Sequence, residues 1–345
     1  MRALTLASLG GPDALAVRDV PAPALSAATD VRIAVHAAAI NRLDLFVTHG
    51  LPGITLEFPH IVGTDAAGVV ESVGPAVRHV RPGDRVIVNP GISCGACAAC
   101  AAGDQPLCNK FGVLGEHRPG TAAELLVVPA VNVAPMPDRM SWAQAAAFSL
   151  ATLTAWRMLI TRAALRAGET VLVWGAGGGV AQAAMQVARL TGGEVIVASG
   201  SDAKLDLARR LGAHHTINHA TGDAAAEVKR ITGRRGAQVV VDSVGEATWP
   251  LSLRCLARGG RLVTCGATTG PMVGLDVRKL FWHQWSILGS TMGSHSEYAA
   301  VVALAARGEL WPIVDQIVPL ERGAEAFRRL ARGEQAGKLV LEVTA

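Results

Sequence analysis

Four of the six cysteines in this chain lie close together in the sequence, with the pattern Cys94-x-x-Cys97-x-x-Cys100 and then Cys108. Four thiolates at this spacing can surround one zinc ion tetrahedrally, and a site made only of cysteines has no open coordination position. Disulfides and a redox Cys-x-x-Cys pair are the alternatives, but no secretory signal starts the chain and a redox pair needs only two cysteines. The sequence therefore predicts one structural zinc ion bound by these four residues.

A second chemical pattern is the glycine-rich segment Gly175-Ala176-Gly177-Gly178-Gly179-Val180, which lies between the apolar run Thr170–Trp174 and a helical stretch over 180–190. Glycines in such a turn let the backbone approach a pyrophosphate, and the following helix offers free N–H groups and a partial positive charge. An ordinary glycine-rich loop is the alternative, but the strand before it and the helix after it favour a dinucleotide site. Val180 stands where a third fingerprint glycine is expected, and the small Ala181 follows it.

The end of the next expected strand selects between the two nicotinamide coenzymes. An acidic residue there binds the ribose 2′-hydroxyl and favours NADH. Here the residue is Ser199, followed by Gly200 and Ser201, which leave room for a 2′-phosphate that Lys204 can reach. Asp202 is interpreted as a first-turn acid of the next helix. The sequence favours NADPH over NADH.

Composition sets the frame for these sites. The chain has 345 residues, of which 50% are hydrophobic and 17% charged, as is usual for globular proteins. The net charge of +4 is spread along the chain and is not gathered in a basic tail, so no nucleic-acid partner is expected. The longest uncharged stretch, between Arg139 and Arg157, is too short to span a bilayer. We interpret it as one buried helix, capped by Ser141 and Gln144, and expect a cytoplasmic protein.

Two patterns divide the chain. Up to about residue 127, short apolar segments broken by Gly and Pro predict a β-rich region. After about residue 140, strands and helices alternate, as in a parallel sheet with crossover helices. Six strands are expected there, which fit a complete dinucleotide fold: 170–174, 194–199, 214–218, 238–242, 261–265 and 286–289.

Five features in order resemble the medium-chain dehydrogenase/reductase superfamily, which includes zinc alcohol dehydrogenases and quinone oxidoreductases. They are Asn41-Arg42-Leu43-Asp44, the segment Gly63–Gly68, the four-cysteine lobe, the glycine-rich turn and Gly337-Lys338. The resemblance implies an α/β protein with a GroES-like catalytic domain over 1–127 and 290–345, carrying the zinc lobe at 91–111. It also implies a doubly wound Rossmann domain over 128–289, and a substrate held between the two.

The resemblance breaks at the family's catalytic zinc. Its three ligand positions correspond to Asn41, Thr64 and Leu150, and zinc prefers thiolate, imidazole or carboxylate ligands. The pattern of Asn41 and Asp44 is similar to that of zinc-free quinone oxidoreductases. We therefore expect no catalytic zinc, and name Asn41, Asp44 and Thr64 as the catalytic candidates, with Asn41 donating to a substrate oxygen. His49 and His60 flank these motifs and are further candidates for the proton donor.

Other residues are expected to contact the coenzyme, either because they match family positions or because they follow predicted strands. The set is Arg42, Thr154, His219, Val244, Cys265, Gly266, Ala267, Gly289, Ser290 and Lys338.

The resulting expectation is an NADPH-dependent oxidoreductase that transfers hydride to a quinone, an activated alkene or a reactive carbonyl. One alternative is an alcohol or aldehyde dehydrogenase of the same superfamily, and another is a nucleotide-binding protein without catalysis. The single tyrosine, Tyr298, is far in sequence from the tyrosine acid of the enoyl thioester reductases, which argues against that subgroup. The expected partners are a small-molecule substrate and a second copy of the chain, with no membrane.

Overall fold

The computed structural model describes residues 1–343, and the chain forms two compact units. Unit 1 comprises Met1–Ala151 and the chain from Gly293 onward, whereas unit 2 comprises Thr152–Met292. The sequence placed the first boundary after residue 127. The observed boundary lies later because the strands that follow residue 124 add to the sheet of unit 1.

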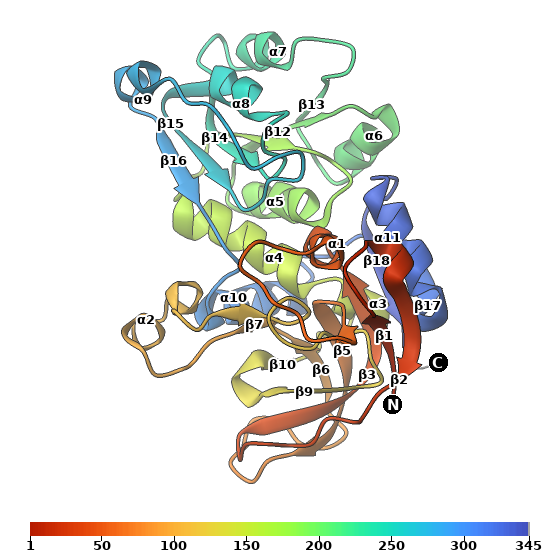
Figure 1. The fold of residues 1–345 in the computed structure, drawn as a ribbon. Helices are drawn as coiled ribbons and strands as arrows, with labels where there is room; N and C mark the ends of the chain where they lie inside the picture. The colour runs from red at the N-terminus through yellow and green to blue at the C-terminus, as the bar shows by residue number, and fades with distance from the viewer. Residues whose placement is uncertain (344–345) are drawn as a thin grey trace. The chain divides into compact units, whose positions relative to one another are not determined.

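Unit 1 is built on a seven-stranded sheet, counted over residues 1–343, with the order β10-β6-β5-β3-β18-β17 and with β9 also pairing with β3 (Figure 1). Its strands are β3 (Asp30–Ile40), β5 (Asp65–Val73), β6 (Arg85–Val88), β9 (Leu125–Pro129), β10 (Val133–Pro135), β17 (Val314–Pro319) and β18 (Lys338–Glu342). A three-stranded sheet adds β1 (Arg2–Leu6), β2 (Leu15–Asp19) and β4 (His60–Ile61), and a small ladder adds β7 (Gly91–Ile92) and β8 (Gly112–Val113).

The central pair of this sheet is β3 and β5. Every second residue at the start of β3 is fully buried, as in Val31, Ile33 and Val35, which is the period-two pattern of a strand with one face on the core. A Cβ added at Gly68 of β5 would lie 2.1 Å from the carbonyl oxygen of Ala34. Only glycine therefore lets the two strands approach at this point.

Helices and short turns complete unit 1. The helices are α1 (Arg42–His49), α2 (Ala98–Ala101), α3 (Trp142–Ala146), α10 (His295–Ala306) and α11 (Gly323–Ala331). Single 3₁₀ turns cover Pro12–Ala14, Gln105–Leu107, Ala130–Asn132 and Leu320–Arg322.

The stretch between Arg139 and Arg157 is not the single helix expected from the sequence. It forms α3 and then α4 (Ser149–Trp156), which begins in unit 1 and continues into unit 2. The predicted capping box is present, since Gln144 and Ser141 exchange hydrogen bonds of 3.0 and 3.3 Å. The break has a physical reason: the N–H of Leu150 donates to the carboxylate of Asp65 at 2.8 Å, whereas in a continuous helix it would bond the carbonyl four residues earlier.

Unit 2 is a six-stranded parallel sheet, counted within residues 1–343, with the order β13-β12-β11-β14-β15-β16. This is the doubly wound order expected for a dinucleotide fold, so the predicted fold class is confirmed. The strands are β11 (Thr170–Trp174), β12 (Glu194–Ser199), β13 (His215–Asn218), β14 (Ala237–Asp242), β15 (Leu256–Thr264) and β16 (Ser286–Gly289).

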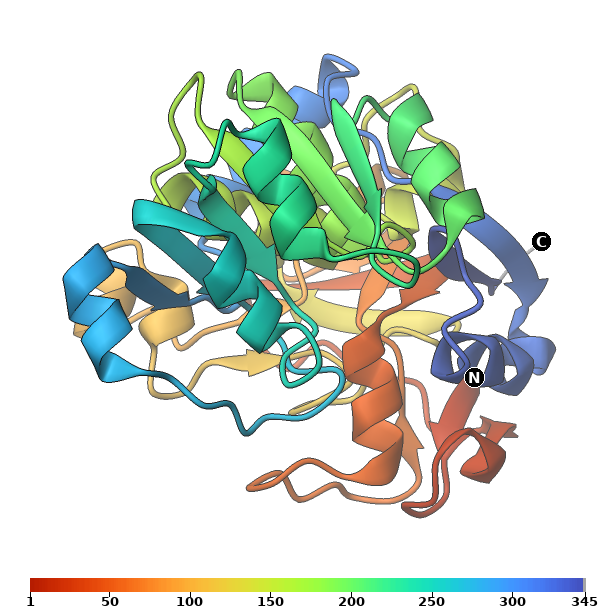
Figure 2. The same ribbon diagram turned by 90° about the horizontal axis from the view of Figure 1, so that it is seen from above.

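The crossover helices of unit 2 cover both faces of the sheet, with α5 on one face and α7 and α8 on the other (Figure 1). Their bounds are α5 (Gly179–Leu190), α6 (Asp202–Arg210), α7 (Ala224–Ile231), α8 (Trp249–Cys255) and α9 (Val277–His283), and a π-helical segment covers Arg157–Arg162. Both views place α9 at one margin of this unit, beside β16 (Figures 1 and 2). No helix within residues 1–343 is long and apolar enough to cross a membrane.

Candidate functional site

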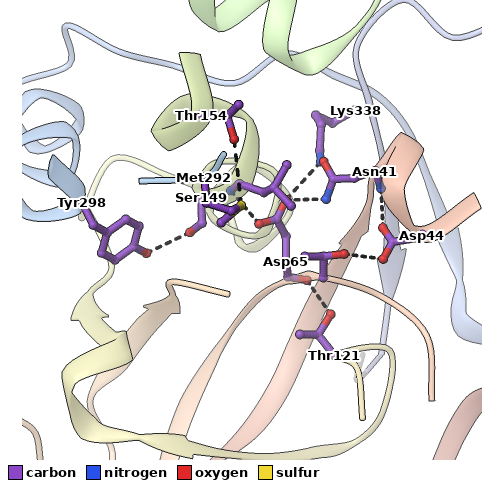
Figure 3. A network of polar contacts seen from close by, with 11 residues as sticks. Asn41, Asp44, Asp65, Thr121, Ser149, Thr154, Met292, Tyr298 and Lys338 are labelled. Carbon is purple, nitrogen blue, oxygen red and sulfur yellow. Dashed lines mark hydrogen bonds and ion pairs between the residues drawn. The ribbon is translucent and has the colours of Figure 1, made fainter. Parts of the chain in front are cut away.

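Asp65, the first residue of β5, is the centre of a buried polar network in unit 1 (Figure 3). Its side chain is completely buried. Oδ2 accepts hydrogen bonds from Asn41 Nδ2 at 2.9 Å and Lys338 Nζ at 3.1 Å, and Oδ1 accepts the Leu150 N–H at 2.8 Å. The hydroxyl of Thr121 donates to the backbone carbonyl of Asp65 at 2.9 Å. Every side-chain oxygen of this buried carboxylate thus has a donor, as burial of a charge requires.

The register between β18 and β3 brings Lys338 next to Asn41, although the two residues are remote in the sequence. Strand β18 pairs antiparallel with β3, and Leu339 lies opposite Ile40. Lys338 and Asn41 are the next residues outward on the two strands, and Lys338 Nζ donates to Asn41 Oδ1 as well as to Asp65. Lys338 was predicted to contact the coenzyme. In unit 1 this residue is 4% exposed, and these two side chains hold its ammonium group.

Asp44 and Thr64 form a second contact beside this network. Asp44 is the third residue of α1, and its Oδ2 accepts the backbone N–H of Asn41 at 2.5 Å, which caps the helix. The hydroxyl of Thr64 donates to Asp44 Oδ1. The structure therefore brings together all three predicted catalytic residues, and their catalytic role remains a prediction.

Burial raises the pKa of Asp44 to about 7. The hydrogen bonds from Thr64 and from the Asn41 backbone, together with the charge of Lys338, lower the pKa, and the charge of Asp65 raises it. Because burial exceeds the sum of the favourable contacts, Asp44 can hold or release a proton near neutral pH.

The two histidines that flank the motifs have other partners. His60 is buried, and its Nε2 donates to the carbonyl of Gly115 at 2.9 Å. His49, in the last turn of α1, has its Nδ1 3.0 Å from the carbonyl of Leu45. Burial lowers the pKa of His60. Both rings bind backbone carbonyls, and no hydrogen bond within residues 1–343 links either ring to the network around Asp65.

In unit 2, most of the predicted coenzyme residues follow the carboxyl ends of the parallel strands. Since all six strands are parallel, these ends lie along one edge of the sheet, where dinucleotides bind in this fold. The residues at this edge are Gly175, Gly177, Gly178, Gly179 and Val180 after β11, Ser199, Gly200 and Ser201 at β12, His219 after β13, Val244 after β14, Cys265, Gly266 and Ala267 after β15, and Gly289 and Ser290 at β16. Lys204 lies in the first turn of α6, and Thr154 lies in α4 with its hydroxyl 4.0 Å from the sulfur of Met292 (Figure 3).

The glycine-rich turn has the geometry that an anion site needs. Gly175 has φ 86°, a left-handed conformation that favours glycine. A Cβ at Gly178 would meet no atom within 4 Å, so space is open at the N-terminus of α5. The side-chain amide of Gln182 donates to the carbonyl of Ala176 at 3.1 Å and holds the turn. The turn therefore fits the pyrophosphate of a dinucleotide.

The residues expected at the adenosine ribose lie together. Ser199 is buried, and its hydroxyl accepts the N–H of Ser201 at 3.4 Å. The His219 ring is next to Gly200, since a Cβ there would lie 3.4 Å from His219 Cε1. The carboxylate of Asp202 accepts a 2.7 Å hydrogen bond from Asn218. Asp202 lies in the first turn of α6, as the sequence indicated.

Sequence reasoning missed Asp242, the last residue of β14. Its carboxylate is fully buried and accepts the N–H groups of Val244 and Gly245 at 2.9 and 3.1 Å. It also accepts the hydroxyls of Thr248 at 2.9 Å and Ser252 at 2.6 Å. Asp242 thus fixes the turn that carries Val244. In the sequence, an acidic residue at the end of a mostly apolar strand could have indicated this role of Asp242.

Within the described chain, Ser290 has an unpaired hydroxyl at the edge of the sheet. Its hydroxyl oxygen is buried and has no hydrogen-bond partner within residues 1–343. Buried hydroxyls are almost always paired, and a bound coenzyme would supply a partner. Cys265, nearby after β15, has its pKa raised to about 12 by burial, so the thiol is neutral.

The four-cysteine lobe matches the prediction. The ligand atoms of Cys94, Cys97, Cys100 and Cys108 lie within 4.8 Å of one another. Zinc–sulfur bonds of about 2.3 Å in a tetrahedron place the sulfurs about 3.8 Å apart. The Sγ atoms of Cys97 and Cys100 are 3.6 Å apart, and those of Cys94 and Cys100 are 3.9 Å apart. The N–H groups of Ala96 and Cys97 lower the pKa of Cys94 to about 6, whereas burial and the hydrogen bonds with the neighbouring thiols raise that of Cys97 to about 11. The lobe fits one zinc ion.

Comparison with known proteins agrees with this construction. Residues 27–138 match the family described as "Alcohol dehydrogenase GroES-like domain", and residues 179–307 match "Zinc-binding dehydrogenase". Human quinone oxidoreductase is 29% identical, with 99% of this chain and 97% of the relative covered. The NAD-dependent alcohol dehydrogenase of Sulfurisphaera tokodaii is 31% identical, with 99% of each chain covered. A crystal structure titled as an NAD-dependent alcohol dehydrogenase is 43% identical, covers 100% of both chains and has a TM-score of 0.96.

A GroES-like unit with a buried polar network and a Rossmann unit with a dinucleotide turn define an oxidoreductase. The chain belongs to the medium-chain dehydrogenase/reductase superfamily, as the sequence indicated.

Proposed function

We propose that this oxidoreductase transfers hydride from NADPH to a quinone, an activated alkene or a reactive carbonyl, without a catalytic zinc ion. The observation that carries the proposal is the donor set of unit 1. The three positions that hold the catalytic metal in the zinc alcohol dehydrogenases are here an amide, a hydroxyl and an aliphatic side chain: Asn41, Thr64 and Leu150. The polar pair among them is hydrogen-bonded to Lys338, Asp65 and Asp44.

These residues can polarise an acceptor by hydrogen bonding. Quinones and enones delocalise the charge that hydride addition creates, so they need less electrophilic help than a plain ketone. Asn41, 8% exposed, offers a substrate oxygen the amide N–H that Asp65 does not accept. The Thr64 hydroxyl donates to Asp44, and Asp44 can hold a proton near neutral pH.

The preference for NADPH rests on the end of β12. A bound NADPH supplies the hydride, and its 2′-phosphate distinguishes it from NADH. Ser199, Gly200 and Ser201 bring no carboxylate to repel that phosphate, and the ring of His219 is adjacent. In unit 1, the half-buried guanidinium of Arg42 has no hydrogen bond or ion pair within residues 1–343, so its donors are available to an anionic group of either coenzyme.

The second candidate is an alcohol dehydrogenase, which the names of two relatives favour. The Sulfurisphaera protein and the 43%-identical structure are both titled NAD-dependent alcohol dehydrogenases. For this chain, that function requires a metal site or another electrophile in place of Asn41 and Thr64.

One experiment separates the candidates. The purified protein is tested with NADPH and NADH against a panel of quinones, enones, aldehydes and ketones, and for oxidation of alcohols with both oxidised coenzymes. Metal content is measured in the same preparation. We expect turnover of quinones or enones with NADPH and about one zinc per chain. Two zinc ions per chain, or faster alcohol oxidation with NAD⁺, would establish the second candidate, and coenzyme binding without any turnover would indicate a non-catalytic protein.

We further propose that two copies associate through the β16 margin of unit 2. Strand β16 ends the sheet order and pairs only with β15 among residues 1–343. Large apolar side chains are exposed on α9 and on the loop before it, including Phe281 (65%) and Trp282 (67%). An unpaired edge beside exposed apolar residues is suited to association. Light scattering should show a dimer that F281E/W282E dissociates, whereas L190E, at an exposed leucine of α5, should leave it intact.

Four reduced cysteines in a zinc site also favour a reducing compartment. We therefore propose that the protein acts in the cytoplasm.

A further inference from the structure

Lys338 has a position in the network that explains how Asn41 can act. An asparagine amide has a carbonyl oxygen that accepts and a nitrogen that donates, and the two ends are interchangeable in shape. The useful orientation must therefore be set by neighbours. Asn41 has two such neighbours, Lys338 and Asp65.

The two neighbours select the same orientation. An ammonium group only donates, so Lys338 Nζ must face Asn41 Oδ1. An ionised carboxylate only accepts, so Asp65 must face Asn41 Nδ2, at 2.9 Å. A flipped amide would place donors against the ammonium and an acceptor against the carboxylate, and both hydrogen bonds would be lost. Burial makes this costly, because Lys338 is 4% exposed and Asp65 is not exposed.

The frame that holds the amide is itself fixed. Asp65 is held by the N–H of Leu150 at 2.8 Å and by Lys338 Nζ at 3.1 Å. Lys338 is held by the pairing of β18 with β3, which places Leu339 opposite Ile40. One N–H of Asn41 is used by Asp65, and the second has no acceptor within residues 1–343.

We propose that Lys338 is a positioning residue that orients the Asn41 amide, so that its second N–H donates to the oxygen of the hydride acceptor. This inference rests on the proposed function. It gives Lys338 a role in the acceptor site rather than the coenzyme contact expected from the sequence.

A double-mutant cycle tests the proposal with wild type, K338M, N41A and K338M/N41A. We expect each single variant to lower kcat for a quinone or enone by about 10²-fold, the usual effect of losing one oxyanion donor. The double variant should be no slower than the slower single variant, because both changes remove the same hydrogen bond. The dissociation constant of NADPH, measured by fluorescence without acceptor, should be unchanged. K229M, at an exposed lysine of α7, is the matched control.

Several results would overturn the proposal. Multiplied losses of kcat in the double variant would show that Lys338 acts independently of Asn41. A weaker NADPH affinity in K338M, retained in the N41A background, would make Lys338 a coenzyme contact. If K338M does not fold because Asp65 is left uncompensated, K338R keeps the charge while displacing the donor, and it should lower kcat with unchanged NADPH affinity.

A stability measurement separates this inference from the proposed function. The urea midpoints of the same four proteins report the contact without turnover, and a double variant that loses less than the sum of the singles shows that the two residues interact. Additive midpoints would overturn the contact. No turnover by wild type, with non-additive midpoints, would instead overturn the proposed function.

Discussion

The phenol oxygen of Tyr298 lies 2.8 Å from the hydroxyl oxygen of Ser149, although the two residues are 149 positions apart in the chain. Both side chains are buried, and Ser149 directly precedes Leu150, whose N–H binds Asp65. The only tyrosine of the chain is thus bonded to the residue that precedes Leu150, a member of the polar network (Figure 3). Burial raises the pKa of Tyr298, which keeps the phenol protonated. Its hydrogen bond helps to fix the start of α4.

Removing this phenol should change stability more than catalysis. Y298F loses one buried hydrogen bond and leaves Ser149 without that partner, so it should lower the free energy of unfolding by about 1–2 kcal/mol. We expect kcat to stay within about threefold of wild type. The reason is that the Tyr298–Ser149 hydrogen bond does not involve Asn41, the residue proposed to bind the hydride acceptor. Urea denaturation and steady-state kinetics provide the two measurements. A loss of turnover with unchanged stability would instead identify Tyr298 as a proton donor.

An acid at the end of β12 should reverse the coenzyme preference. S199D places a carboxylate near the expected 2′-phosphate, and like charges in close contact cost several kcal/mol. We expect NADPH affinity to fall by about 10²-fold, while NADH affinity rises because the carboxylate can bind the ribose hydroxyls. S199A, which adds no charge, is the control and should retain the wild-type preference. An NADPH affinity that is equal in all three proteins would show that the 2′-phosphate does not lie near Ser199.

The zinc lobe should stabilise the protein without taking part in turnover. C108S removes one of four thiolates, so zinc content should fall from about one to near zero per chain. The loss should lower Tm by on the order of 10 °C, because several kcal/mol are lost and each is worth roughly 2–4 °C in a unit of this size. C255S alters a buried cysteine outside the lobe and should retain zinc. Full zinc content in C108S would refute the four-cysteine site.

Asp44 should make stability depend on pH in a defined direction. Its pKa is about 7 in the folded protein and about 3.8 in the unfolded chain, so between these values the folded state holds a proton that the unfolded state has released. Its contribution is therefore fully present below pH about 4 and is lost as pH rises through 7. The unfolding free energy of wild type minus that of D44N should fall by up to about 1.4 kcal/mol per pH unit in this window.

Urea titrations of both proteins from pH 5 to 8 provide that difference. D44N keeps the shape of the side chain and cannot ionise, so the histidines contribute equally to both curves. A difference that does not vary with pH would mean that Asp44 is ionised throughout the range.

The sequence predicted unit 2 well for a physical reason. Buried parallel strands are continuous apolar runs that end at glycine or polar residues, and β12 and β16 were expected at their observed bounds. The start of β15 was missed by five residues, because Leu256 pairs with Ala237 before a register shift. Such an irregularity has no periodic signal in the sequence.

The polar network was less predictable, because its partners are remote in sequence. Asn41, Asp44 and Thr64 were named from motifs, but their link through Asp65 and Lys338 depends on the register of β18 against β3. The helix break before Ser149 was missed because no glycine or proline marks it. Its cause is the carboxylate of Asp65, which accepts an N–H from a residue 85 positions away.

The place of β18 between β3 and β17 also bears on how the protein is made. A ribosome releases β3 early, but β18 only after the whole of unit 2 has been synthesised. Until then, β9 covers only Asp30–Ala34 on this edge of β3, so Ala37–Ile40 have no partner there and Asp65 has no ammonium group beside it. Unit 2 is continuous in the chain and can fold first, whereas unit 1 must wait. During synthesis, the coenzyme-binding unit can therefore form before the acceptor site is assembled.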